Sequence, residues 1–138
     1  MSRVSEMSRT DVAARAGHAG AFLAAARLVD ELGADAEISP TSNIVGSLAV
    51  LAGIAAADAL CGHFLAARSS SDDHGEAVRL LASAHPRCRG HAAHLRRLLA
   101  AKTNSHYSAD VLGEVKAREL LIAASRLVEG MRAELDAA

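Results

Sequence analysis

Aromatic residues are scarce in this chain: among 138 residues, two are phenylalanine, one is tyrosine and none is tryptophan. β-Branched residues are also few, whereas alanine, the best helix former, supplies much of the 51% hydrophobic content. Because strands favour aromatic and β-branched side chains, their scarcity argues against a β-sheet protein. The composition therefore predicts an all-α fold with a thin, alanine-rich core and closely spaced helices.

Neither an excess charge nor a cysteine motif indicates a function. A net charge of −1 disfavours bulk attraction to nucleic acid or membrane surfaces, and leaves room only for local basic patches. Cys61 and Cys88 form no C-x-x-C pair and no apolar segment follows Met1, so we expect a reduced, cytoplasmic protein. The most apolar run, 44–57, ends at Asp58, short of the roughly 20 residues of a membrane span. We expect a buried core helix there and no membrane association.

Apolar residues recur at helical spacing along most of the chain. We expect helices over five ranges: 10–33, 43–67, 75–84, 90–106 and 109–135. Thr10-Asp11 and Ser108 are the expected N-terminal caps of the first and last helix. Residues 1–9 are expected to form a flexible arm, and 10–138 a single domain. Four main helices and one short helix with short connections predict an up-and-down bundle.

The segment 102–108, Lys-Thr-Asn-Ser-His-Tyr-Ser, closes the fourth helix and contains the only tyrosine. Lys102 and His106 are four residues apart and continue the face of the leucines before them, so they point toward the groove between helices. One interpretation is a phosphate site in which Lys102 and protonated His106 bind the anion, Asn104 donates its amide, and Tyr107 stacks or donates. The alternative is that the cations complement the helix dipole and Tyr107 packs the corner.

Asp58 interrupts the most apolar helix, where an unpaired carboxylate is costly to bury. It needs a partner, which we expect to be an arginine, a histidine or Tyr107. Asp58 either fixes the register of the helices or belongs to a site as a residue with a shifted pKa.

Two further groups of residues carry weaker signals. Cys88, His91 and His94 stand at three-residue intervals, but no second carboxylate or histidine motif supports a metal site, so we expect no metal and no cofactor. A basic cluster is either a solvated face or a contact for RNA phosphate, and it consists of Arg79, Arg87, Arg89, Arg96 and Arg97.

Three motifs between 43 and 134 carry a family resemblance. They are Ile-Ala-Ala-Ala-Asp-Ala-Leu at 54–60, Arg-Ser-Ser-Ser-Asp-Asp-His-Gly at 68–75, and Leu-Leu-Ala-Ala-Lys-Thr-Asn-Ser-His-Tyr-Ser at 98–108. With these motifs the chain resembles the HEPN superfamily of small all-α domains, and most of all its compact bacterial members. The resemblance implies a helical bundle that acts as a homodimer.

Many HEPN proteins are metal-independent RNases, in which an arginine stabilises the phosphate and a histidine, after about four to six intervening residues, handles protons. In that signature the arginine is often followed by Asn, Asp or His. Three pairs here have a similar spacing, Arg68–His74, Arg87–His94 and Arg89–His94, but none has such a following residue, and we treat them as chance matches. At the position of the family motif the chain has Lys102, with only three residues between it and His106, and Arg97 lies too far upstream.

The predicted function is therefore binding of a nucleotide, of RNA phosphate or of a partner protein, centred on Lys102, His106 and Tyr107. A role in stress response or in a toxin–antitoxin-like system follows from the resemblance alone. Two alternatives stay open. One is a metal-independent endoribonuclease that uses His106 with Lys102 or Arg97, and the other is a scaffold that binds no ligand.

Overall fold

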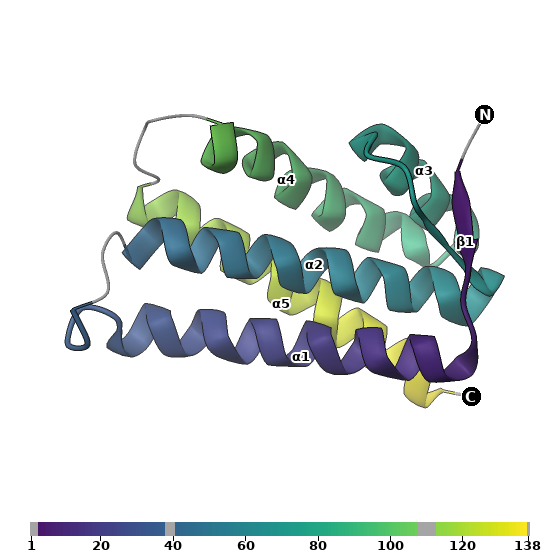
Figure 1. The fold of residues 1–138 in the computed structure, drawn as a ribbon, viewed down its shortest axis with the longest axis horizontal. Helices are drawn as coiled ribbons and strands as arrows, with labels where there is room; N and C mark the ends of the chain where they lie inside the picture. Colours follow the sequence, from purple (N-terminus) through teal and green to yellow (C-terminus); the bar gives the residue numbers. More distant parts are fainter. Residues whose placement is uncertain (1–2, 38–40, 108–112, 138) are drawn as a thin grey trace.

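The computed structural model describes residues 3–37, 41–107 and 113–137, and for 102–107 it describes the backbone alone. The elements follow in the order β1 (Val4–Glu6), α1 (Arg9–Leu32), α2 (Thr41–Leu65), β2 (Ala67–Ser69), α3 (His74–Ala84), α4 (Cys88–Tyr107) and α5 (Glu114–Asp136) (Figure 1). The all-α class predicted from composition is confirmed, with α3 as the short helix.

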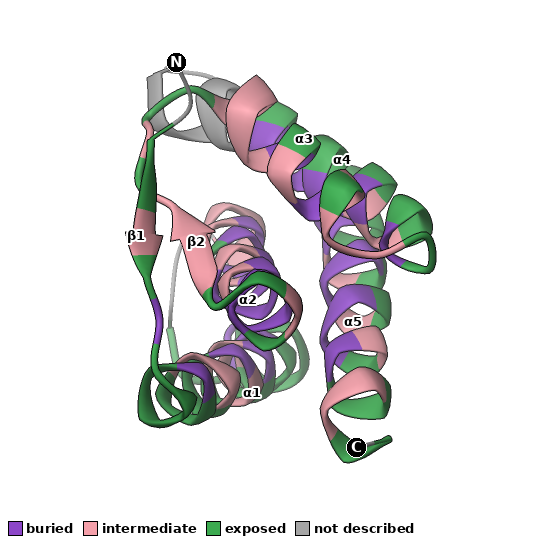
Figure 2. Cartoon of the chain, turned by 90° about the vertical axis from the view of Figure 1, so that its right-hand side faces the viewer, coloured by how far each residue is buried: buried purple, intermediate pink, exposed green. Residues whose placement is uncertain are grey.

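Helix α2 is the centre of the bundle. It packs along α1 and also contacts α5, α4 and α3, and Figure 2 shows it enclosed by the other elements. Its buried residues are small or medium in size and lie on nearly every side, as expected for a central helix. By length and composition α2 could cross a membrane, but 67% of its most apolar window is buried inside the bundle. A core helix meets the same criterion.

The N-terminal residues form structure that the sequence does not predict. Val4–Glu6, expected in a flexible arm, form β1, which pairs antiparallel with β2. The Met7 N–H donates to the Ala66 carbonyl (2.8 Å), and the Met7 side chain is buried. Ala66 has a left-handed φ of 54°, and its N–H donates to the Gly62 carbonyl, which ends α2 and turns the chain into β2.

The helix starts also differ from some expectations. Ser8, and not Thr10, caps α1: its hydroxyl accepts from the Asp11 N–H (3.1 Å), while the Asp11 carboxylate accepts from the Ser8 N–H (2.9 Å). This capping box also holds the pKa of Asp11 below its usual range. Gly113 precedes the first residue of α5, and the expected cap Ser108 lies outside the described residues.

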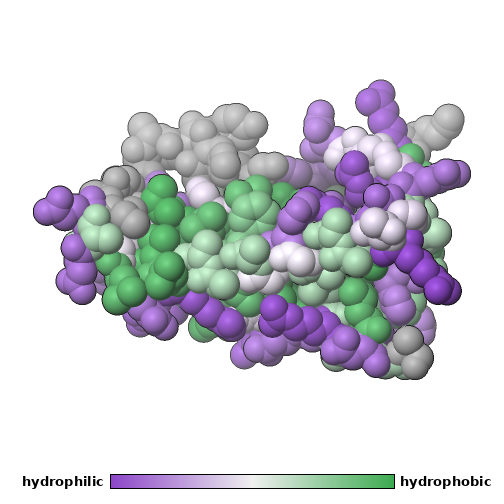
Figure 3. Space-filling model, turned by 60° about the horizontal axis from the view of Figure 1, so that its bottom comes forward, coloured by the Kyte–Doolittle hydropathy of each residue, from purple (hydrophilic) through white to green (hydrophobic). Residues whose placement is uncertain are grey.

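Some large apolar side chains stay exposed. Leu28 and Leu32 near the end of α1, with Ile44 and Leu51 of α2, are among them. Figure 3 shows hydrophobic surface gathered toward the end of the molecule where α1 ends and α2 begins. The homodimer stays a prediction from the sequence.

Close approach of helices to α2 depends on glycine. A Cβ at Gly53 would overlap Cδ1 of Leu98 on α4, and the Leu98 side chain is fully buried. We expect Gly53→Ala to lower the free energy of unfolding by about 1–3 kcal/mol, since overpacking forces side chains and backbone to shift. Urea denaturation followed by circular dichroism measures the change.

The matched control is Gly17→Ala on α1. A Cβ at Gly17 meets no atom within 4 Å, so this substitution should stabilise the protein by up to about 1 kcal/mol through helix propensity alone. Equal effects of the two substitutions would contradict the role assigned to Gly53.

Candidate functional site

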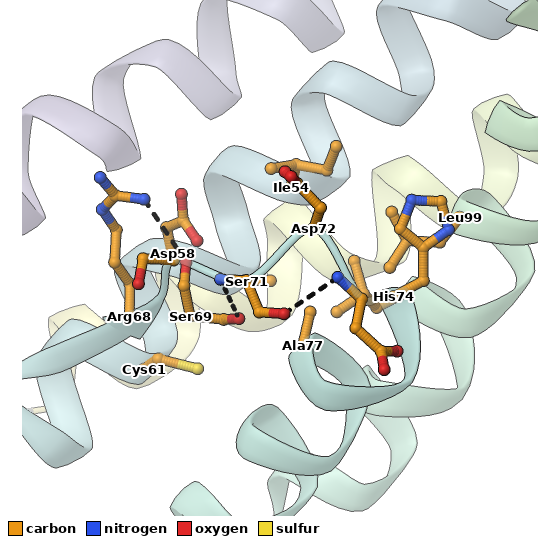
Figure 4. Close-up of a pocket in the computed structure, with 14 residues that line it drawn as sticks. Ile54, Asp58, Cys61, Arg68, Ser69, Ser71, Asp72, His74, Ala77 and Leu99 are labelled. Atoms are coloured by element: carbon orange, nitrogen blue, oxygen red, sulfur yellow. Dashed lines mark hydrogen bonds between the residues drawn. The ribbon is translucent and has the colours of Figure 1, made fainter. Parts of the chain in front are cut away.

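A cavity of about 710 Å³ lies between α2, the β2–α3 connection and α4 (Figure 4). Residues from all three segments and from the first turns of α3 line it. They are Ile54, Ala57, Asp58, Cys61, Arg68, Ser69, Ser70, Ser71, Asp72, Asp73, His74, Ala77, Leu95 and Leu99. The cavity therefore joins segments that are far apart in the sequence.

The floor of the cavity is apolar. Ile54 and Ala57 stand one turn apart on α2, and Leu95 and Leu99 stand one turn apart on α4. Both leucines are buried members of the core, so the floor is backed by packed side chains and is fixed in place. Such a surface suits a flat apolar group.

The opposite wall is polar and is formed by residues 68–74, which are the end of β2, its connection to α3 and the first residue of α3, and which include three serines and two aspartates. Hydrogen bonds within it hold its shape: the Ser71 N–H donates to the Ser69 hydroxyl (3.4 Å), and the Asp73 N–H donates to the Ser71 hydroxyl (3.0 Å). Asp73 also caps α3 by accepting from the N–H groups of Gly75 (2.8 Å) and Glu76 (3.3 Å). Pairing of β1 with β2 anchors the start of this wall through main-chain hydrogen bonds.

Asp58 is the charged group of the α2 wall, and its partner is an arginine. Nη2 of Arg15 donates to Oδ2 of Asp58 at 3.0 Å, which confirms one of the partners expected for Asp58. Burial raises the pKa of Asp58, while the positive charges of Arg15 and Arg68 oppose that rise. Nε of Arg15 is buried and has no hydrogen-bond partner among the described residues.

The thiol in the cavity is not reactive at neutral pH. Burial, and then the nearby charge of Asp58, raise the pKa of Cys61 to about 12. Since the thiolate is the nucleophilic form of cysteine, Cys61 acts here as a small apolar side chain.

The candidate residues at the end of α4 fall where the side chains are not described. Lys102, Asn104, His106 and Tyr107 lie in the last turns of α4, and their side chains are outside the described part of the chain. The backbone of α4 runs from Leu99 in the cavity directly to these positions. Arg97 is exposed on α4 and does not line the cavity, whereas Asp58 does.

Two residues that spacing alone did not single out belong to the cavity. Arg68 and His74, expected to be a chance match in spacing, both line the cavity. Ser69, Ser70 and Ser71 lie between them and face the same space. The available signal was the polar Arg68–Gly75 motif, but nothing in the sequence showed that it folds against Asp58.

The Cys88, His91 and His94 group serves packing between α4 and α5. Burial is the main reason why the pKa of each histidine is lowered, and a Cβ at Gly130 of α5 would overlap the His91 ring. Within 3–37, 41–107 and 113–137, wherever side chains are described, no three His, Cys, Asp or Glu residues are placed to share a metal ion. Glu134 of α5 instead accepts two hydrogen bonds from Arg87, both at 2.8 Å.

The Arg15–Asp58 pair predicts a pH-dependent stability. Arg15→Gln removes a charged donor from a mostly buried carboxylate, so the free energy of unfolding at neutral pH should fall by about 1–3 kcal/mol. Burial raises the pKa of Asp58 in the folded state, so its ionised form destabilises the fold as pH rises through that pKa. Loss of Arg15 raises the pKa of Asp58 further. The loss of unfolding free energy caused by Arg15→Gln should therefore become smaller toward about pH 4, where Asp58 is protonated. Urea denaturation across this pH range measures it.

The control is the same substitution in an Asp58→Asn background. In that background Arg15→Gln should lower the free energy of unfolding by less, and the change should depend little on pH, because no carboxylate remains to be neutralised. An equal, pH-independent loss in both backgrounds would mean that Arg15 acts through packing of its aliphatic stem.

Comparisons of the chain with protein-family models, with curated proteins and with solved structures found no match. The resemblance to HEPN domains therefore stays a prediction from the sequence.

Proposed function

We propose that the protein is a HEPN-like domain that binds a nucleotide, with the nucleoside part in the cavity between α2, the 68–74 connection and α4. The observation that carries this proposal is the pairing of a fixed apolar floor with a wall of hydroxyl and carboxylate groups. A nucleoside has the same division, since its base is flat and its ribose carries hydroxyl groups. The volume of about 710 Å³ is within the range of small-molecule sites, roughly 300–1,000 Å³.

The polar groups of the cavity match a nucleoside better than a phosphate. Three carboxylates, those of Asp58, Asp72 and Asp73, line the cavity, and they would repel a phosphate placed among them. Carboxylates accept hydrogen bonds from the N–H groups of a base and from ribose hydroxyls. The serine hydroxyls can both donate and accept, which also suits a ribose. The base would lie against Ile54 and Leu99.

This proposal is tested by filling the cavity. Ala77 lines it from α3, and Ala77→Leu places a larger side chain there that is also a good helix former. We expect the wild-type protein to bind at least one of the common ribonucleosides or their monophosphates in calorimetric titration. Ala77→Leu should weaken that binding about tenfold or more.

The matched control is Ala93→Leu, the same change at an exposed position of α4 outside the cavity. It should leave the affinity unchanged. Failure of every nucleoside and nucleotide to bind the wild-type protein would contradict the proposed function and would favour the scaffold alternative.

RNA cleavage is a second candidate function, favoured by one observation. Arg68 and His74 line one cavity, and the five residues between them match the spacing of the HEPN nuclease signature. A histidine as proton donor or acceptor and an arginine beside the phosphate would supply a metal-independent cleavage. The next residue is Ser69, where that signature often has Asn, Asp or His.

Incubation of labelled RNA with the protein in the presence of a chelator separates binding from cleavage. We expect the RNA to stay intact, because three carboxylates line the cavity beside its single arginine, Arg68, and they would repel a transferred phosphate. Cleavage that His74→Ala abolishes and His63→Ala, an exposed control outside the cavity, retains would instead establish the nuclease. Cleavage lost only in His106→Ala would place the reaction at the end of α4.

A further inference from the structure

A second, smaller cavity of about 300 Å³ adjoins the first and lies between α3 and α4. Its lining residues are His74, Gly75, Val78, Arg79, Arg96, Leu99 and Ala100. His74 and Leu99 line both cavities, so the two spaces meet at these side chains. Figure 4 shows His74 and Leu99 side by side in the wall of the first cavity.

The two cavities differ in charge. Three carboxylates and one arginine, Arg68, line the first, whereas the lining of the second contains two arginines and no carboxylate. Arg79 and Arg96 are both exposed, and neither forms a hydrogen bond or an ion pair with another residue in the part of the chain that the structure describes. Two guanidinium groups on facing helices are therefore available to an anion.

Arg79 is also directed toward the junction of the cavities. Its Nη1 lies 3.1 Å from the point where a Cβ of Gly75 would stand, so the guanidinium folds back along α3 toward His74. Asp73 Oδ1 lies 3.1 Å from the same point, but it already accepts hydrogen bonds from the N–H groups of Gly75 and Glu76. The absence of a side chain at Gly75 leaves the space that Arg79 occupies.

We propose that the second cavity is the phosphate subsite of the nucleotide whose nucleoside part occupies the first cavity, with Arg79 and Arg96 as the phosphate ligands. This inference depends on the proposed function. Guanidinium groups bind phosphate through two parallel hydrogen bonds, and two of them from different helices enclose it from two sides. His74, at the junction, lies where the ribose is joined to the phosphate. The ligand is a phosphorylated nucleoside, either as a free nucleotide or as the phosphorylated end of an RNA.

The test compares a nucleoside with its monophosphate on the full chain. For the wild-type protein we expect the monophosphate to bind about tenfold or more tightly than the nucleoside, with an advantage that declines as salt increases. The double variant Arg79→Gln/Arg96→Gln should bind the two ligands equally, and its affinity for the nucleoside should match that of the wild type. Both positions are exposed, so thermal unfolding is expected to be unchanged.

The control is Arg89→Gln/Arg118→Gln, which removes the same charge from exposed positions outside both cavities and should keep the advantage of the monophosphate. Equal affinity of the wild type for nucleoside and monophosphate would overturn the phosphate subsite and leave the proposed function intact. Weaker nucleoside binding by the Arg79→Gln/Arg96→Gln variant would likewise overturn the phosphate subsite and leave the proposed function intact. If neither ligand binds, the proposed function itself fails.

A second pair of ligands distinguishes the source of the phosphate. Short oligoribonucleotides with and without a 5′-phosphate are titrated beside adenosine and adenosine monophosphate. A phosphate advantage for the oligonucleotide alone identifies the ligand as an RNA end, and an advantage for the mononucleotide alone identifies a free nucleotide. Either outcome supports the subsite if the arginine double variant removes the advantage, and overturns it if the advantage persists.

Discussion

The close packing of α2 is the constraint on which the rest of this structure depends. Alanine and glycine supply most of its buried residues, so α1, α4 and α5 can approach its backbone on several sides. At Gly53 the approach leaves no room even for a methyl group beside Leu98. A central helix of this kind has little tolerance for polar groups, and Asp58 is therefore held by Arg15 from the neighbouring helix. The same packing brings α4 close enough to α2 for the two helices to form one apolar floor.

Much of this architecture follows from local properties of the sequence. Alanine content and helical periodicity predict the five helices, because both act over a few residues. The β1–β2 pair could not be predicted in this way, since each strand has three residues and its partner lies about sixty positions away. The cost of burying a carboxylate predicts that Asp58 has a partner, but the sequence contains too many arginines to single out Arg15.

The cavity could be predicted from the sequence even less well than the strand pair. The segment 102–108 stands out because it gathers chemically active residue types, whereas a cavity is defined by which segments meet in space. The Arg68–His74 spacing resembles two others in the sequence, and only the fold shows that it lines a cavity with Asp58. Residue spacing alone cannot rank such pairs, because it does not report which side chains face a common space.

Charged side chains are distributed unequally between the two adjoining cavities. Carboxylates gather beside the apolar floor, and the two arginines lie beyond His74 between α3 and α4. An anionic group is favoured beside the two arginines and disfavoured beside the carboxylates. A molecule with a neutral part and an anionic part therefore has one preferred orientation. The polar wall of the first cavity, residues 68–74, is held at one end by β1 and at the other by the Asp73 cap of α3. The N-terminal strand, although distant in sequence from every cavity residue that it supports, is thereby part of the construction of the site.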